Sequence, residues 1–134
     1  MKKIIYSPGE PSGIGPDLII KLSSSKLWEN LKIPIVSIGD PKLFIDRAAL
    51  LKKKIKIIEL DSLNKVSKNS KGLIQIIKVT KCSNTSPGKL SKSNAQYVLD
   101  NLTYSIKQTM QNEGTALVTG PLSKENIISI DKLF

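Results

Sequence analysis

Short runs of β-branched and other apolar residues alternate along this chain with longer segments of helical period. Several of the short runs are almost continuously apolar, which is typical of strands covered on both faces. Strands that alternate with helices predict a mostly parallel α/β sheet with helices on both faces. The predicted strands are residues 3–6, 34–38, 55–59, 73–78 and 115–118, and the predicted helices are residues 16–24, 41–51 and 93–113.

The segment 93–113 has the clearest helical period. Ser93 and Gln96 have the spacing of a capping box, and Gly114 follows where a left-handed residue commonly ends a helix. Apolar residues at spacings of three or four form one stripe, which predicts a core-facing surface rather than a cofactor site. The stripe consists of Ala95, Val98, Leu99, Leu102, Ile106 and Met110. The polar stretch 61–72 predicts a surface loop.

The last predicted elements are a strand, a turn and the beginning of another helix at residues 123–130. An α/β layer needs each element to be covered by its neighbours, so ending on a half-used element is unusual. We therefore expect residues 1–134 to form one incomplete α/β domain that belongs to a longer protein.

The composition indicates the cellular compartment in which the protein works. The apolar share is 40%, and no apolar run approaches the twenty or so residues of a membrane span. The apolar run after Met1 is too short for a signal peptide. Cys82 is the only cysteine, so no internal disulfide can form. We expect a cytoplasmic protein with no membrane partner.

The net charge of +10 raises the question of nucleic-acid binding. Of the 21 cationic residues only Arg47 is an arginine, and aromatic residues make up just 4%. Base readout and base stacking favour Arg and aromatic side chains. The lysines are also spread along the chain, so we expect no nucleic-acid partner.

A segment rich in Gly and Pro, Gly9–Asp17, lies between the first predicted strand and the first predicted helix. Its glycines permit positive φ and close backbone approach, while a Pro at the first helical position leaves N–H groups at the helix start for a ligand. The spacing fits neither the dinucleotide fingerprint nor the P-loop. The segment could be only a tight connection, or it could hold an anion. Because the carboxylates of Glu10 and Asp17 would repel a phosphate, a site for a cationic or hydroxyl-bearing group is equally compatible. The candidate site residues are Gly9, Glu10, Ser12, Gly13, Gly15 and Asp17, and Gly13 is expected to need an unusual φ.

A second turn, Thr119-Gly120-Pro121, follows the last predicted strand. Ligands of open parallel sheets gather outside the carboxyl ends of strands, so the two turns could share one crevice. The candidate residues there are Gly120, Pro121, Ser123 and Lys124. Lys124 either pairs with a phosphate or is one more solvated lysine. A third polar turn, residues 85–89, has no feature beyond that of a turn.

The segment Gly9-Glu10-Pro11-Ser12-Gly13-Ile14-Gly15-Pro16-Asp17 resembles the amino-terminal signature of the 4-hydroxythreonine-4-phosphate dehydrogenase family. Other pieces agree with that family in order along the whole chain. They are Asp46-Arg47-Ala48, Gly88 with Leu90, Asn94 with Tyr97-Val98, and Thr119-Gly120-Pro121 with Lys124.

This resemblance implies an NAD-dependent oxidation and decarboxylation of 4-phosphooxy-threonine on the route to pyridoxal phosphate. It further implies a homodimer of two-domain α/β/α subunits with a divalent metal held by His residues, of which this chain would be a truncated amino-terminal part without the second domain. The metal would act as a Lewis acid.

The sequence contains no His, which is its main departure from the family pattern. No catalytic or metal-binding residue of the family can be carried over, and the family's substrate-contacting His-Thr pair would fall just after Phe134. We therefore expect the chain alone to be inactive and to bind neither NAD nor the metal fully. The alternative hypothesis is a stand-alone module that binds a phosphorylated ligand without catalysis.

Overall fold

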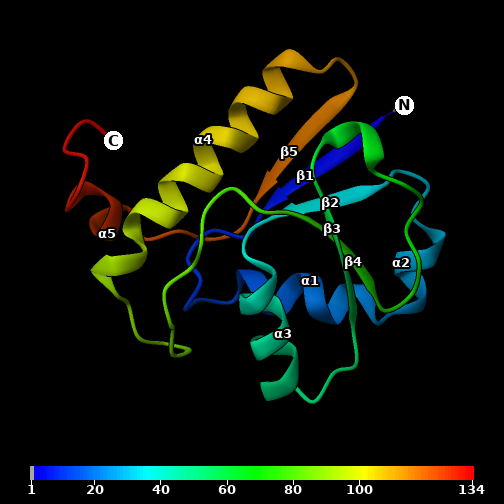
Figure 1. Cartoon of the computed structure of the whole chain (residues 1–134), viewed down its shortest axis with the longest axis horizontal. Helices are drawn as coiled ribbons and strands as arrows, with labels where there is room; N and C mark the ends of the chain where they lie inside the picture. Colours follow the sequence, from blue (N-terminus) through cyan, green and yellow to red (C-terminus); the bar gives the residue numbers. More distant parts are fainter. Residues whose placement is uncertain (1) are drawn as a thin grey trace.

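The computed structural model describes residues 2–134 and contains one parallel five-stranded sheet (Figure 1). Its strand order is β3-β4-β2-β1-β5, so the first strand lies inside the sheet and pairs with β2 and β5. The strands are β1 (Lys3–Ser7), β2 (Ile35–Ile38), β3 (Lys56–Leu60), β4 (Leu73–Ile77) and β5 (Thr115–Thr119). The predicted α/β class and all five predicted strands are confirmed.

Helices cover both faces of the sheet. In Figure 1, α4 (Ala95–Gln111) lies on one side, while α1 (Gly15–Ser23) and α3 (Pro41–Leu50) lie on the other. Two five-residue helices, α2 (Lys26–Asn30) and α5 (Lys124–Ile128), pack at the ends of longer helices. The sequence pattern missed α2, which is too short to show a period and is fixed by its buried Trp28.

Alternate residues of the central strands feed two apolar clusters, as the period of two in a strand requires. Tyr6 and Ile35 join the cluster on the side of α1 and α3. Ile5, Val36 and Ile38 join the cluster on the other face. Burial of each such side chain contributes on the order of 2 kcal/mol, so the loops at the strand ends stand on a rigid base.

The predicted start of α4 is wrong. The helix begins at Ala95, and Ser93 lies in a 3-10 turn with its hydroxyl 2.6 Å from that of Ser91. The side chain of Gln96 instead bonds Asp100, so no capping box forms. Gly114 does adopt the predicted positive φ of +78°.

The predicted core stripe of α4 is also only partly right. Ile106 and Met110 are 44% and 82% exposed, although Ala95 and Val98 are buried. The buried positions in the middle of the helix are Asn101 and Ser105. That packed face is offset by one residue from the apolar stripe, which is about 100° around a helix.

The stretch 61–72 is not simply a surface loop. It contains a 3-10 turn, Leu63–Lys65, and it buries Leu63 and Val66 against the sheet. Asn69 is also buried, and its Oδ1 accepts a hydrogen bond from the N–H of Ile35 at 3.0 Å. None of the helices among residues 2–134 is long and apolar enough to cross a bilayer.

Candidate active-site scaffold

Three loops meet at the carboxyl ends of the strands, where a parallel sheet presents its binding residues. The first is the signature loop, Pro8–Ile14, the second is the segment 80–91, and the third is the turn 119–123. The N–H of Glu10 donates to the carbonyl of Pro121 at 2.9 Å, which joins the first loop to the third. The N–H of Gly88 donates to the carbonyl of Ser12 at 2.7 Å, which joins the second loop to the first.

Three glycines allow this close approach of backbones. A Cβ on Gly9 would lie 2.2 Å from the carbonyl oxygen of Pro121, and Gly9 also has a φ of +83°. A Cβ on Gly15 or on Gly120 would lie 1.8 or 2.1 Å from the carbonyl oxygen of Pro8. The two predicted turns therefore pack directly on each other, and a ligand crevice shared by them stays a prediction.

Gly13 is not the strained glycine of this loop. Positive φ in the signature loop occurs at Gly9 alone, and a Cβ on Gly13 would lie 3.3 Å from the carbonyl oxygen of Glu10 and 3.6 Å from its Cβ. The expectation of an unusual φ at Gly13 is therefore wrong. Its identity matters less for backbone geometry than that of Gly9 or Gly15.

Arg47, the only arginine, binds the backbone of the signature loop through its guanidinium group. Its side chain is 3% exposed and extends from α3 into the loop. Its Nη1 donates to the carbonyl of Gly13 at 2.9 Å and to Oδ1 of Asp17 at 2.8 Å, while Nη2 donates to the carbonyl of Pro11 at 2.5 Å. The planar guanidinium fork suits such convergent acceptors better than an ammonium would.

The carboxylate of Glu10 is buried and turns back into its own loop. Its Oε1 accepts hydrogen bonds from the hydroxyl of Ser12 at 2.9 Å and from the N–H of Ser12 at 3.3 Å. Asp17 is paired with Arg47 in the same way. The amide of Ser12 is thus used internally and is not free to bind an anion. Both carboxylates are themselves paired within the chain, so a tight connection, an anion site, and a site for a cationic or hydroxyl-bearing group all stay predictions.

The third loop leads into α5. The hydroxyl of Ser123 accepts a hydrogen bond from the N–H of Asn126 at 3.2 Å and so caps the helix. Lys124 is exposed at the first residue of α5 and forms no ion pair within residues 2–134. Pro121 is exposed as well. Ser123 therefore has a structural role, while Lys124 remains available for a ligand.

A buried polar cluster supports the second loop. Asp40 caps α3 through the N–H of Lys42 at 3.1 Å, and its other carboxylate oxygen accepts from the N–H of Cys82 at 2.9 Å. The hydroxyl of Tyr97 accepts from the N–H of Asp40 at 2.9 Å, and Oδ1 of Asn94 accepts from the N–H of Ser83 at 2.9 Å. The motif residues Asn94 and Tyr97 thus position the backbone at Ser83 and at Asp40.

Burial raises the pKa values of two side chains in this cluster, Cys82 and Tyr97. It raises the pKa of the Cys82 thiol to about 12, with the carboxylates of Asp40 and Glu10 adding to the shift. Burial also raises the pKa of Tyr97 above its ordinary value. Neither group is ionised near neutral pH, so neither is prepared to act as a nucleophile.

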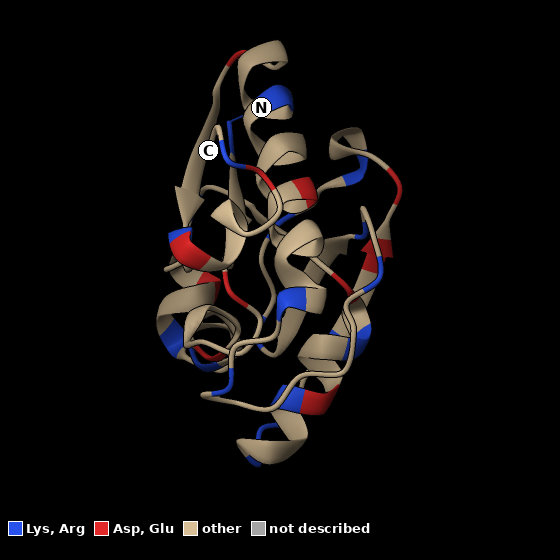
Figure 2. Ribbon diagram, turned by 90° about the vertical axis from the view of Figure 1, so that its left-hand side faces the viewer, with Lys and Arg blue, Asp and Glu red and all other residues tan. Residues whose placement is uncertain are grey.

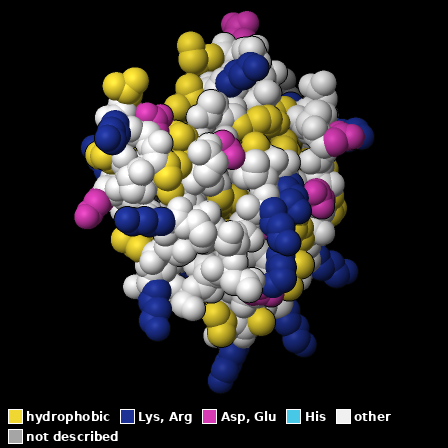
Figure 3. All heavy atoms as spheres, turned by 60° about the vertical axis from the view of Figure 1, so that its left-hand side comes forward, with side chains coloured by type: hydrophobic (Ala, Val, Ile, Leu, Met, Phe, Trp, Pro, Cys, Tyr) yellow, Lys and Arg dark blue, Asp and Glu magenta, His cyan; other side chains and the backbone are white. Residues whose placement is uncertain are grey.

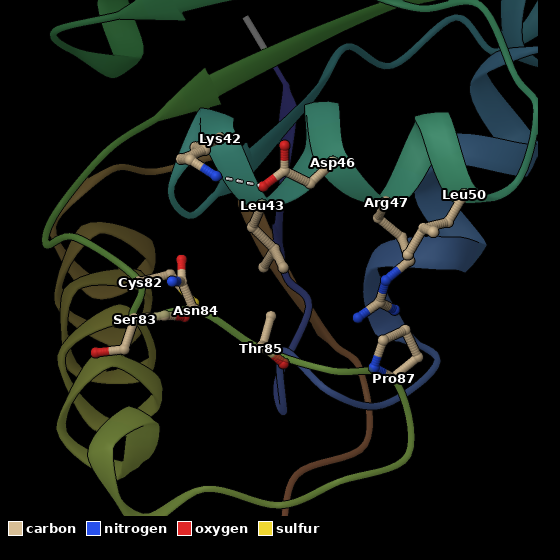
Figure 4. A pocket seen from close by; sticks show the side chains of 10 residues that line it. All are labelled: Lys42, Leu43, Asp46, Arg47, Leu50, Cys82, Ser83, Asn84, Thr85 and Pro87. Carbon is tan, nitrogen blue, oxygen red and sulfur yellow. Dashed lines mark hydrogen bonds and ion pairs between the residues drawn. The ribbon is translucent and has the colours of Figure 1, made fainter.

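A pocket of about 130 Å³ lies between α3 and the second loop (Figure 4). In Figure 4, Arg47 extends from α3 toward Thr85 and Pro87, and Lys42 is paired with Asp46 at the rim. Oγ1 of Thr85 is buried and has no hydrogen-bond partner within residues 2–134. The pocket is lined by Lys42, Leu43, Asp46, Arg47, Leu50, Cys82, Ser83, Asn84, Thr85 and Pro87.

Charged residues are interspersed over the molecule. Figure 2 shows Lys and Arg positions and Asp and Glu positions in several parts of the ribbon. In Figure 3, dark-blue Lys and Arg side chains line up down the right-hand part of the face, and others project from its lower outline. The absence of a nucleic-acid partner stays a prediction. Within residues 2–134 no group of three or more His, Cys, Asp or Glu side chains could hold a metal ion.

Sequence reasoning missed the role of Arg47 as the support of the signature loop. The available signal was its rarity, since a single Arg in a chain where every other cation is Lys indicates a position that needs a planar fork. The roles of Asp40 and Tyr97 had no comparable signal, because their partners are backbone groups far away in the sequence.

Comparison with solved structures supports the fold. The chain superposes on the structure titled as a 4-hydroxythreonine-4-phosphate dehydrogenase from Klebsiella pneumoniae with a TM-score of 0.86, at 22% identity, covering 100% of this chain and 41% of that one. A second such structure, from Burkholderia phymatum, gives 0.84 at 18% identity, covering 95% of this chain and 38% of that one. At these identities the likeness concerns the fold alone.

Sequence comparison gives the family. A curated 4-hydroxythreonine-4-phosphate dehydrogenase of Citrobacter koseri is 33% identical over 124 residues, which cover 92% of this chain and 36% of the relative. A relative of the same name from Pseudoalteromonas translucida is 35% identical over 122 residues, 91% of this chain and 36% of that protein. The chain thus spans about a third of the length of these relatives, in agreement with the expectation of a partial enzyme. Residues 30–132 match the family model described as pyridoxal phosphate biosynthetic protein PdxA, and the chain belongs to that family.

Proposed function

We propose that this chain supplies the loop scaffold of a cytoplasmic, NAD-dependent and metal-dependent 4-hydroxythreonine-4-phosphate dehydrogenase that oxidises and decarboxylates 4-phosphooxy-threonine as a homodimer. The observation that carries the proposal is the family match over residues 30–132. The signature loop, clamped by Arg47 at the carboxyl ends of the strands, adds support from the structure.

The role proposed for this chain is positioning. Arg47 fixes the signature loop, the contact of Gly9 with Pro121 holds it against the end of β5, and the contact of Gly15 with Pro8 closes the loop on itself. A hydroxyl or ammonium group of the substrate would lie near Glu10 in the signature loop. Lys124, which is exposed three residues after Pro121, would pair with the substrate phosphate. Precise positioning of this kind is a large part of what an active site contributes.

The divalent metal of the family does not fit the residues present. The sequence has no His, and the described residues offer no cluster of metal-binding side chains. Any metal ligands must come from another polypeptide segment, and the chain alone is therefore expected to lack dehydrogenase activity.

The test follows NADH absorbance with 4-phosphooxy-threonine, NAD and Mg²⁺, Mn²⁺ or Zn²⁺. The chain alone should give no turnover. An in-frame fusion to the part of the Citrobacter koseri relative outside the 124-residue match should be active. Turnover by the chain alone would contradict the proposal, because the chemistry would then need none of the missing ligands.

Lys124 gives a finer test within the active fusion. Lys124→Ala should raise the KM for the phosphorylated substrate several-fold with little change in kcat, because it removes a phosphate-pairing ammonium. Lys26→Ala, an equally exposed lysine in α2, is the matched control and should change neither constant. If the fusion is inactive but the chain binds the phosphorylated substrate by itself, the alternative of a binding module without catalysis is correct.

A further inference from the structure

The guanidinium of Arg47 has donors that the signature loop does not use. Nη1 donates to the carbonyl of Gly13 and to the carboxylate of Asp17, and Nη2 donates once, to the carbonyl of Pro11. The Nε–H and the second N–H of Nη2 therefore make no hydrogen bond within residues 2–134. The side chain is only 3% exposed, and N–H groups at such a depth are normally paired. These two donors indicate a position for an acceptor from outside the chain.

The unused part of the guanidinium lies at the pocket between α3 and the second loop. Arg47 lines this pocket, and in Figure 4 its side chain extends from α3 toward Pro87. Nε is not one of the fully buried unpaired atoms of residues 2–134, so a solvent-sized group reaches it there. The hydroxyl oxygen of Thr85, by contrast, is fully buried and cannot meet a ligand without movement. Arg47 is thus the polar anchor of the pocket.

The charge of the lining favours an anion. Of the charged residues that line the pocket, Arg47 and Lys42 are cationic and only Asp46 is anionic. Asp46 is paired with Lys42 at the rim, so its charge is offset there. The carboxylate of Asp17, which pairs with Arg47, is 25% exposed and partly screened by solvent. A carboxylate forms a charge-assisted pair with a guanidinium that a neutral acceptor cannot match.

The rest of the lining is largely apolar. Leu43, Leu50 and Pro87 line the pocket together with Cys82, whose thiol is neutral because burial raises its pKa to about 12. Leu50 is 66% exposed and lies at the mouth. The volume is about 130 Å³, which is close to that of an apolar cavity able to hold benzene. A ligand of about six to nine non-hydrogen atoms with one anionic end matches this size and polarity.

We propose that this pocket binds a small monocarboxylate with a short apolar chain. The carboxylate accepts hydrogen bonds from the Nε–H and Nη2–H of Arg47, and the chain packs against Leu43 and Leu50. Arg47 also holds the carbonyls of Pro11 and Gly13, so the bound acid steadies the group that fixes the signature loop. Occupation of the pocket is thereby coupled to the order of that loop. Binding needs neither NAD nor the metal, so this site is independent of the proposed function.

The test is an NMR titration of the chain with butyrate at constant ionic strength. Arg47 is the only arginine, so its Nε–H gives a single resonance of its kind. That resonance and the amides of Ser83 and Thr85 should shift saturably, with a Kd of about 1 mM for so small a ligand. Hydrogen exchange of the amides from residue 12 to residue 17 should slow severalfold at saturation, because the acid adds an interaction to the loop's support.

Two variants and one neutral ligand locate the site. Leu50→Glu places a like charge at the mouth and should weaken butyrate binding by at least about tenfold. Ile45→Glu, at a similarly exposed apolar position of α3 outside the lining, is the matched control and should bind normally. Both side chains are exposed, so both variants should fold, which circular dichroism checks. Butyramide, which lacks the charge, should bind at least about tenfold more weakly than butyrate.

A resonance of Arg47 Nε–H that does not move at about 50 mM butyrate would overturn the proposal. Equal affinities for butyrate and butyramide would overturn the role of the carboxylate, and equal affinities for butyrate and inorganic phosphate would show an unselective anion site instead. Equal binding by wild type and Leu50→Glu would overturn the assignment to this pocket. Because the titration needs no turnover, inactivity of the fused enzyme would refute the proposed function and leave this inference standing.

Discussion

Replacing Arg47 by Met should destabilise the protein strongly and loosen the signature loop. Met has a similar length and keeps most of the packing, so the loss isolates the guanidinium. The substitution removes the donors for the carbonyls of Pro11 and Gly13 and for the carboxylate of Asp17. Removal of one partner from a buried ion pair typically lowers stability by about 3–5 kcal/mol.

The structure places the expected loss at the lower end of that range. The side chain of Asp17 is 25% exposed, so water can partly replace the guanidinium there. The carbonyl of Pro11 is buried and cannot be rehydrated without opening the loop, which adds roughly 1–3 kcal/mol. We therefore expect a loss of about 3 kcal/mol in the free energy of unfolding. For a chain of this size that lowers Tm by roughly 10 °C.

Urea and thermal unfolding followed by circular dichroism measure this loss, and hydrogen exchange of the amides from residue 12 to residue 17 reports the loop directly. Arg47→Lys should recover only part of the stability, because an ammonium cannot reach all three acceptors. Lys42→Met, which breaks the exposed pair with Asp46, should change almost nothing. A loss below about 1 kcal/mol for Arg47→Met, with unchanged loop exchange, would refute the clamp.

Two further predictions concern the glycines and the thiol. Gly15→Ala should lower the free energy of unfolding by roughly 3 kcal/mol or more, because its Cβ would lie 1.8 Å from the carbonyl oxygen of Pro8. Gly13→Ala should be tolerated far better, and equal Tm values for the two variants would contradict this prediction. Cys82 has a pKa raised from 9.0 to about 12, so the unfolded thiol ionises first and stability should fall as the pH rises from about 9 toward 12. Urea titrations at pH 8 and pH 10 on wild type and on Cys82→Ala measure this slope, which should be smaller in the variant, where the raised pKa of Tyr97 still contributes.

The sequence predicted the sheet well because its strands have a local signature. The strand Ile35–Ile38 is apolar except at Ser37 and is buried at every position, as expected of a strand covered on both faces. The face that α4 packs on the sheet was not predictable in the same way. Asn101 and Ser105 are buried because the helix is rotated to bring Tyr97 onto Asp40, and that contact joins residues far apart in the chain.

In the candidate site, too, some features had a local sequence signal and others depend on contacts between distant residues. The location of the signature loop at a strand end and the need for glycine at Gly9 and Gly15 followed from local pattern. The choice of strained glycine did not, because φ at Gly9 is set by its contact with Pro121 across the sheet. For the same reason Arg47, on a separate helix, could be placed only once α3 had been packed against α1.

The interior position of β1 has a consequence for the order of assembly. β1 and its loop leave the ribosome well before β5, because the carbonyl that receives the N–H of Glu10 belongs to Pro121, more than one hundred residues later. Closing so long a separation is slow compared with forming the local β2–α3 unit. During synthesis the loop can therefore be held by Arg47 early, and it reaches its final shape only when the nascent chain has delivered β5. Pausing of translation before β5 would prolong the interval in which one side of β1 is open to mispairing.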